Sequence, residues 1–128
     1  MNIAELVAIV DDDASVREST ECLLRSLGYS TVTFESAQAF LNSGRVSNVR
    51  CLISDIQMPN MCGYELQLRL IAIGHKFPII FITAQEDEVL RTRVLAAGAH
   101  AILTKPYKIR LLTDHLATAL KSYRESCK

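Results

Sequence analysis

The stretch Leu6-Val7-Ala8-Ile9-Val10-Asp11-Asp12-Asp13 decides the fold of this chain. It is a short apolar run that ends in three carboxylates, and two later apolar runs also end in a charged residue. Asp55 follows residues 51–54, and Lys105 follows residues 101–104. Buried strands of a parallel sheet read as continuous apolar runs, and ligands bind outside the carboxyl ends of such strands. The pattern therefore predicts one acidic site, with a lysine, at the carboxyl edge of a parallel sheet.

Apolar runs alternate with helical patterns along the whole chain. Such alternation is typical of a parallel sheet that is covered by helices on both faces. We therefore expect an α/β fold, a doubly wound five-stranded parallel sheet with five helices. The expected strands are Leu6–Val10, Thr31–Phe34, Cys51–Ser54, Ile79–Thr83 and Ala101–Thr104.

The helices are predicted from apolar spacing and from their end signals. Ser15 and Glu18 have the spacing of a capping box at the start of the first helix, and Gly28 is placed to end it. Its expected inner stripe is Val16, Thr20, Leu23, Leu24 and Leu27. A short helix follows Ser36, and the other three are expected over residues 63–74, 86–97 and 108–123. The last one carries Ile109, Leu112, Leu116 and Leu120 on one face.

The helix expected over residues 63–74 carries two apolar stripes where one should suffice against the sheet. Leu66, Leu70 and Ile73 form the first stripe, and Tyr64, Leu68 and Ile71 form the second on the opposite side. The second stripe indicates either a partner surface or deeper burial between neighbouring helices.

Length and composition restrict the class of protein. The chain has 128 residues and equal numbers of basic and acidic residues, 14 of each. We expect one domain over residues 1–123, followed by a polar terminus or the start of a linker over residues 124–128. Zero net charge argues against a nucleic-acid binder. No apolar run is long enough for a membrane span and no signal peptide is visible, so we expect a cytoplasmic protein with reduced cysteines.

Four motifs in order resemble the receiver domain of bacterial two-component response regulators. They are VDDD at residues 10–13, DIQMP at residues 55–59, TA at residues 83–84, and AGAxxxLTKP at residues 97–106. The resemblance covers nearly the whole chain. Its VDDD start and the stretch SDIQMPNMCGYEL at residues 54–66 look closest to the FixJ-like group. It implies a flavodoxin-like sheet with receiver topology.

The resemblance also implies a role for each residue of the acidic site. Asp55 would accept a phosphoryl group from the phosphohistidine of a sensor histidine kinase. Lys105 would pair with a phosphoryl oxygen, Thr83 would donate its hydroxyl to another, and the backbone N–H of Ala84 would support it. The Lys105–Pro106 peptide would be cis. The protein would be a signalling phosphoacceptor rather than an enzyme, with self-phosphorylation from small phosphodonors and self-dephosphorylation.

A divalent cation is the cofactor that the resemblance implies. Asp12 and Asp55 would bind Mg²⁺ through their carboxylates, Gln57 through its backbone carbonyl and Asp11 through a water, and Mn²⁺ or Ca²⁺ could substitute. Mg²⁺ prefers such oxygen ligands and offsets the charge of a carboxylate and a phosphoryl group. Asp13 is left outside this shell, because a helix-start residue at the positive end of the dipole explains it.

Two interpretations remain open for how this domain would pass on its signal. The resemblance favours the receiver half of a transcription regulator, and the alternative is a stand-alone receiver that acts by protein contact. Thr83 and a residue of the last strand form the switch in the family, and alignment places Ile102 there instead of the usual Tyr or Phe. We expect a phosphorylation-dependent homodimer through the helix near residues 86–97 and the strand 101–104, with no nucleic acid and no membrane bound by the domain itself.

Two other classes that use similar architecture fit poorly. An aspartyl-phosphate phosphohydrolase needs a second Asp two residues after its nucleophile, and this chain has Gln57 there. A flavin-binding protein needs a phosphate-cradling loop after the first strand, where three aspartates would repel the phosphate.

Overall fold

Five parallel strands form one sheet in the order β2-β1-β3-β4-β5. The structure is a computed structural model, which describes residues 5–126. The strands are β1 (Leu6–Val10), β2 (Ser30–Phe34), β3 (Cys51–Asp55), β4 (Ile79–Thr83) and β5 (Ala101–Thr104). The strand order reverses between β1 and β3, which places a crevice outside their carboxyl ends. The α/β fold with five parallel strands is therefore confirmed.

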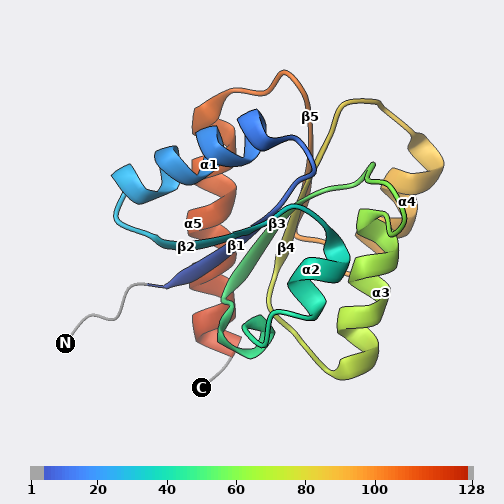
Figure 1. Ribbon diagram of the computed structural model, residues 1–128, viewed down its shortest axis with the longest axis horizontal. Helices are drawn as coiled ribbons and strands as arrows, with labels where there is room; N and C mark the ends of the chain where they lie inside the picture. The colour runs from blue at the N-terminus through green and yellow to red at the C-terminus, as the bar shows by residue number, and fades with distance from the viewer. Residues whose placement is uncertain (1–4, 127–128) are drawn as a thin grey trace.

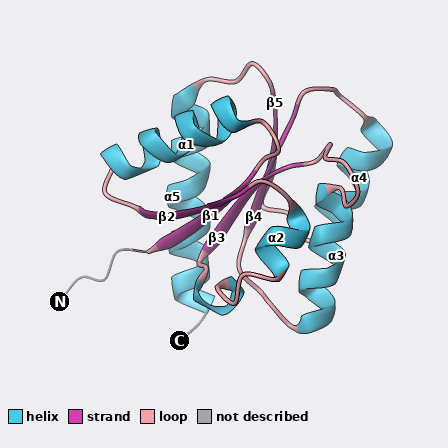
Figure 2. Ribbon diagram, viewed as in Figure 1, coloured by secondary structure: helices cyan, strands magenta, loops and turns pink. Residues whose placement is uncertain are grey.

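Helices cover both faces of the sheet, as Figure 1 shows. They are α1 (Ala14–Ser26), α2 (Ala37–Leu41), α3 (Gly63–Ile73), α4 (Glu88–Ala96) and α5 (Ile109–Ser126), with a short 3-10 helix at Val46–Asn48. α1 and α5 lie on one face, and α2, α3 and α4 lie on the other (Figure 2). None of the helices within residues 5–126 has the length and the apolarity that crossing a membrane requires.

Two apolar cores lie on the two faces of the sheet. Val7, Ile9 and Ile53 point toward α1 and α5, where they meet residues such as Leu24 and Leu116. Alternate strand residues point the other way, because successive side chains of a strand face opposite sides. Cys51 is buried in the core, as predicted, and together with Cys22 and Cys62 it is a free thiol. Cys127 lies outside the described residues.

The start of α1 differs from the prediction. Asp13, not Ser15, is the N-cap residue, and its carboxylate accepts hydrogen bonds from the N–H groups of Ser15 and Val16. The capping box of Ser15 with Glu18 is therefore wrong. The expected helix-start role of Asp13 is confirmed, since a carboxylate there satisfies N–H groups that have no partner inside the helix.

Three apolar residues that were expected to face the core are exposed. They are Leu27, Ile73 and Ile109, at 52%, 65% and 60% of full exposure. Each lies at a helix end: Leu27 is the C-cap of α1, Ile73 is the last residue of α3 and Ile109 is the first of α5. The rest of each helix is inward as predicted, with Leu24, Leu70 and the three leucines of α5 buried. The bounds of α4 and α5 also differ slightly from the predicted ranges: α4 begins after the N-cap Asp87, and α5 continues to Ser126.

Candidate functional site

Three carboxylates meet at the carboxyl edge of the sheet, where β1 and β3 end. Asp11 and Asp55 are buried, at 3% and 8% of full exposure, whereas Asp12 is exposed. One carboxylate oxygen from each of the three lies within 4.8 Å of the others. The alignment of β1 with β3 causes this convergence, because Val10 pairs with Ser54 and the next residues, Asp11 and Asp55, therefore lie side by side. The predicted acidic cluster is confirmed as an arrangement of side chains.

Asp11 is held in place from three sides. Its Oδ1 accepts a hydrogen bond of 2.8 Å from the N–H of Asp13, and its Oδ2 lies 3.9 Å from Nζ of Lys105. Its backbone carbonyl accepts a bond of 2.7 Å from Nη1 of Arg17. Burial raises the pKa of the Asp11 carboxyl, while the N–H of Asp13 and the charge of Lys105 oppose that rise. Sequence analysis missed Arg17, which no motif singled out.

Asp55 is the last residue of β3 and is buried, like Asp11. Its Oδ1 accepts a hydrogen bond of 3.2 Å from the N–H of Gln57. Burial raises the pKa of the Asp55 carboxyl, and the negative charge of Asp11 raises it further, while Lys105 lowers it. Burial and the charge of Asp11 thus disfavour the ionised form of Asp55, and a bound cation or protonation would relieve this cost.

The N-terminus of α3 packs directly behind Asp55 and excludes a side chain from its first position. A Cβ on Gly63 would lie 2.7 Å from the carbonyl oxygen of Asp55 and 2.9 Å from Phe81 Cε1. The N–H of Gly63 donates a bond of 2.8 Å to the carbonyl of Ile56. Glycine is thus required here for close approach, a role that sequence analysis did not assign to it.

Thr83 ends β4 beside the acidic cluster, and its hydroxyl is already engaged. Its Oγ1 lies 3.0 Å from Oε1 of Gln57 and 2.9 Å from the carbonyl oxygen of Gln85. The contact with Gln57 was not anticipated, since the sequence gives only the backbone of that residue a role and carries no signal for its side chain. Side-chain identity at position 57 therefore has a structural consequence.

The remaining predicted residues lie around Thr83. The N–H of Lys105 donates a bond of 2.8 Å to the carbonyl of Thr83, and the Lys105–Pro106 peptide is cis, as expected. Ala84 is exposed at the start of the β4–α4 loop. Ile102 is half-buried and lines, together with Thr83 and Arg91, a pocket of about 340 Å³. The structure therefore brings the predicted switch pair to one pocket.

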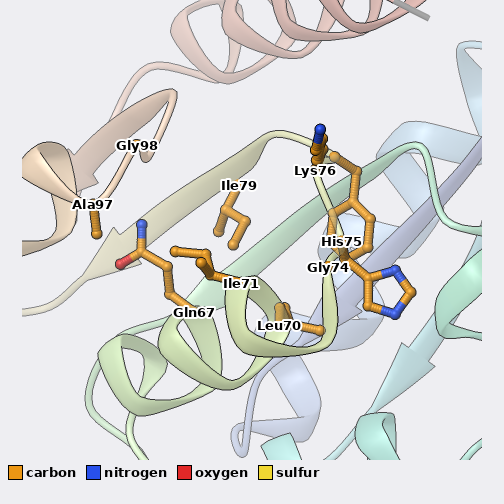
Figure 3. A pocket seen from close by; sticks show the side chains of 10 residues that line it. Gln67, Leu70, Ile71, Gly74, His75, Lys76, Ile79, Ala97 and Gly98 are labelled. Carbon is orange, nitrogen blue, oxygen red and sulfur yellow. The ribbon is translucent and has the colours of Figure 1, made fainter.

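A second pocket of about 300 Å³ lies away from the acidic cluster, between α3, α4 and the loop before β4 (Figure 3). Its walls include Leu70, Ile71 and Ile79, with the amide of Gln67 at the end near Ala97. None of the predicted site residues lines it. This pocket is therefore separate from the acidic cluster.

The donor set of the acidic cluster suits a hard divalent cation. Carboxylate oxygens are the ligands that Mg²⁺ and Ca²⁺ prefer, while His and Cys ligands favour softer metals. Among residues 5–126, the cluster of Asp11, Asp12 and Asp55 is the one group of acidic, His or Cys side chains that converges closely enough to hold an ion. The buried aspartates also carry raised pKa values, a cost that a bound cation offsets.

Comparisons with known proteins agree with the geometry. The family model described as the response regulator receiver domain matches residues 7–117. The response regulator protein TodT of Pseudomonas putida is 39% identical over 118 residues, which are 92% of this chain and 52% of TodT. The transcriptional regulatory protein FixJ of Bradyrhizobium diazoefficiens is 34% identical over 122 residues, 95% of this chain and 60% of FixJ. The chain thus spans about half the length of these curated relatives.

Solved structures show the same fold. The response regulator StyR superposes with a TM-score of 0.89 at 41% identity, covering 97% of this chain and 63% of StyR. The structure titled FixJ-N superposes with a TM-score of 0.83 at 31% identity, covering 94% of this chain and 96% of that one. From the acidic cluster, the strand order and these matches together, the chain belongs to the family of response regulator receiver domains.

Proposed function

We propose that Asp55 is the phosphoacceptor of this receiver domain and that a sensor histidine kinase supplies the phosphoryl group. A carboxylate oxygen of Asp55 attacks phosphorus, the bond between phosphorus and the histidine nitrogen breaks, and that nitrogen keeps the electron pair. Hydrolysis of the aspartyl phosphate by water then restores the carboxylate. The observation that carries this proposal is the position of Asp55, which is buried between a second carboxylate and a lysine at the end of the central strand β3.

The other residues of the site are proposed to manage charge. Asp11, Asp12, Asp55 and the backbone carbonyl of Gln57 would hold Mg²⁺, which offsets negative charge on the attacking and transferred oxygens when bound. Lys105, whose Nζ lies 3.9 Å from Oδ2 of Asp11, would neutralise a phosphoryl oxygen. The hydroxyl of Thr83 and the backbone N–H of Ala84 would donate hydrogen bonds to the other phosphoryl oxygens. Mn²⁺ or Ca²⁺ would fit the same oxygen ligands.

The output is proposed to be transcriptional control. FixJ and TdiR, which this chain matches over about half of their length, are named transcriptional regulatory proteins. We propose that this receiver regulates an output domain in the same manner and acts in the cytoplasm. The alternative is a receiver that signals by protein contact alone, and the reading frame beyond residue 128 distinguishes the two.

Phosphorylation is tested by intact mass after incubation with a small phosphodonor and Mg²⁺. The wild type should gain one phosphoryl group that acid or hydroxylamine removes, and Asp55→Asn should gain none. Asp114→Asn is the matched control, because this aspartate is exposed on α5 and far from the site, and it should react as the wild type does. A phosphoryl group on Asp55→Asn would show that another residue is the acceptor.

A further inference from the structure

The hydroxyl of Thr83 lies within hydrogen-bond distance of two acceptor oxygens. Oε1 of Gln57 lies 3.0 Å away and the carbonyl oxygen of Gln85 lies 2.9 Å away. Both are acceptors, and a threonine hydroxyl has a single proton to donate. These two oxygens therefore compete with any third acceptor for the same proton.

The side chain of Gln57 connects the β3–α3 loop with the end of β4. Its backbone N–H donates to Asp55 Oδ1 at 3.2 Å, so the start of the β3–α3 loop is tied to the phosphoacceptor. Its side chain extends from that loop to the end of β4, 26 positions further along the chain, where it meets Thr83. A single residue thus connects the carboxylate that would be phosphorylated with the hydroxyl that would report it.

The amide lies at the water-facing edge of the site. Gln57 is exposed, whereas Thr83 is buried at 4% of full exposure. Water can therefore solvate the amide once it leaves Thr83, and release carries a modest cost. Loss of one neutral hydrogen bond in such a setting changes an equilibrium by about two- to tenfold.

We propose that the side chain of Gln57 is a positioning residue that retains the Thr83 hydroxyl in the resting state and so opposes the phosphorylated state. The inference rests on the proposed function, because it assumes that the hydroxyl turns toward a phosphoryl group on Asp55. Release of Thr83 by Gln57 is then part of the free energy of activation. The side chain sets the balance between the two states, while the backbone carbonyl of the same residue serves the metal.

The first test uses the resting protein and needs no phosphorylation. The χ1 rotamer of Thr83 is measured by NMR from the couplings of its methyl carbon, in the wild type, Gln57→Met and Gln57→Glu. Met matches the length of Gln and lacks the oxygen acceptor, whereas Glu retains one. We expect a single rotamer in the wild type and Gln57→Glu, and averaging between rotamers in Gln57→Met. An unchanged single rotamer in Gln57→Met would overturn the proposal.

The second test measures affinity for beryllofluoride, a mimic of the phosphoryl group, at saturating Mg²⁺. Gln57→Met should bind it about two- to tenfold more tightly than the wild type. Its affinity for Mg²⁺ alone is measured in parallel, so that a change at the metal is separated from a change at Thr83. Gln38→Ala, which truncates an exposed glutamine on α2, is the control and should behave as the wild type.

A double-mutant cycle assigns the effect to the hydrogen bond. In a Thr83→Val background, which keeps the shape of the side chain and removes the hydroxyl, Gln57→Met should have no further effect. An equal gain in affinity with and without the hydroxyl would overturn the proposal. Failure of the wild type to bind beryllofluoride would instead contradict the proposed function, and the rotamer test would still report on Gln57.

Discussion

Three consecutive aspartates in this chain have three different environments. Asp11 is buried and accepts a hydrogen bond from the N–H of Asp13, Asp12 is exposed, and Asp13 caps α1. The sequence predicts that the cluster raises at least one carboxyl pKa by repulsion between like charges. The pKa values of Asp11 and Asp55 are raised, but burial is the larger cause and the neighbouring charges come after it. Neighbouring residues of one type therefore differ in environment, and solvation of each carboxylate depends on where the fold places it.

The raised pKa of Asp55 predicts how stability depends on pH without metal. Burial raises its carboxyl pKa in the folded state above the ordinary aspartate value of 3.8. The folded state is thus penalised above the folded pKa, and the penalty fades as pH falls toward the unfolded value. We expect Asp55→Asn in EDTA at pH 7 to be more stable than the wild type. Each unit by which the folded pKa of Asp55 exceeds its unfolded pKa corresponds to about 1.4 kcal/mol of free energy of unfolding.

Thermal melts in EDTA from pH 7 down toward the ordinary aspartate pKa of 3.8 check this expectation. The wild type should approach Asp55→Asn as pH falls, and Mg²⁺ should raise the melting temperature of the wild type alone. Asp12→Asn is the control: it removes an exposed carboxylate of the same cluster, so it should gain less stability in EDTA and should also lose the Mg²⁺ response. A larger gain for Asp12→Asn than for Asp55→Asn would contradict burial as the main cause.

Secondary structure was predictable where one physical rule dominates and was not where several compete. Apolar runs identify the three central strands β1, β3 and β4, because a strand buried on both faces reads as a continuous apolar run. The edge strand β2 is only half-buried and mixes threonine with apolar residues. The cap of α1 was misassigned, since Asp13 and Ser15 can both accept hydrogen bonds from helix N–H groups, and the backbone turn decides between them. Periodicity also gives the inward face of a helix but not how far the helix extends past the sheet, which explains the exposure of Leu27, Ile73 and Ile109.

The corrected cap gives a paired test of α1. Asp13→Ala removes the carboxylate that accepts from the N–H groups of Ser15 and Val16, and should reduce the free energy of unfolding by about 0.5–2 kcal/mol. Ser15→Ala should change it far less, because Ser15 is exposed and alanine favours the helix. Urea denaturation at matched pH measures both, and an equal loss in the two variants would argue for the capping box instead.

The site was less predictable than the fold, for a reason that belongs to the whole molecule. The side chains of Asp11, Asp12, Asp55, Thr83 and Lys105 could be predicted to converge, because each lies at or just after the end of a strand and parallel strands bring their carboxyl ends to one edge. The contact between Gln57 and Thr83 depends on how two loops meet, and the sequence contains no rule for that. The outer face of α3 remains open as well: Leu68 and Ile71 are exposed and Tyr64 is half-buried, so the idea of a partner surface stays a prediction.

Phosphorylation is expected to promote self-association through α4 and β5. Thr83 and Ile102 line one pocket beneath that surface, and Ile102 is smaller than an aromatic ring and stiff at its first torsion. We therefore expect the response to depend mainly on the β4–α4 loop and α4. Sedimentation should show a monomer without beryllofluoride and a larger species with it. Ile102→Ala should keep most of this response, and its loss in a variant that still phosphorylates normally would make Ile102 a full switch residue.

The glycine at the start of α3 has a consequence for where this molecule can move. Since Gly63 leaves no room for even a methyl group against β3, α3 can neither roll nor slide there without displacing the strand that carries Asp55. In contrast, Val94 is the one buried residue of α4, and its carbonyl accepts a hydrogen bond from Gln67 of α3. α3 is therefore fixed at its N-terminus, whereas α4 is attached near its C-terminus. Any movement of α4 would therefore rotate the helix about its last turn and displace its first turn the most.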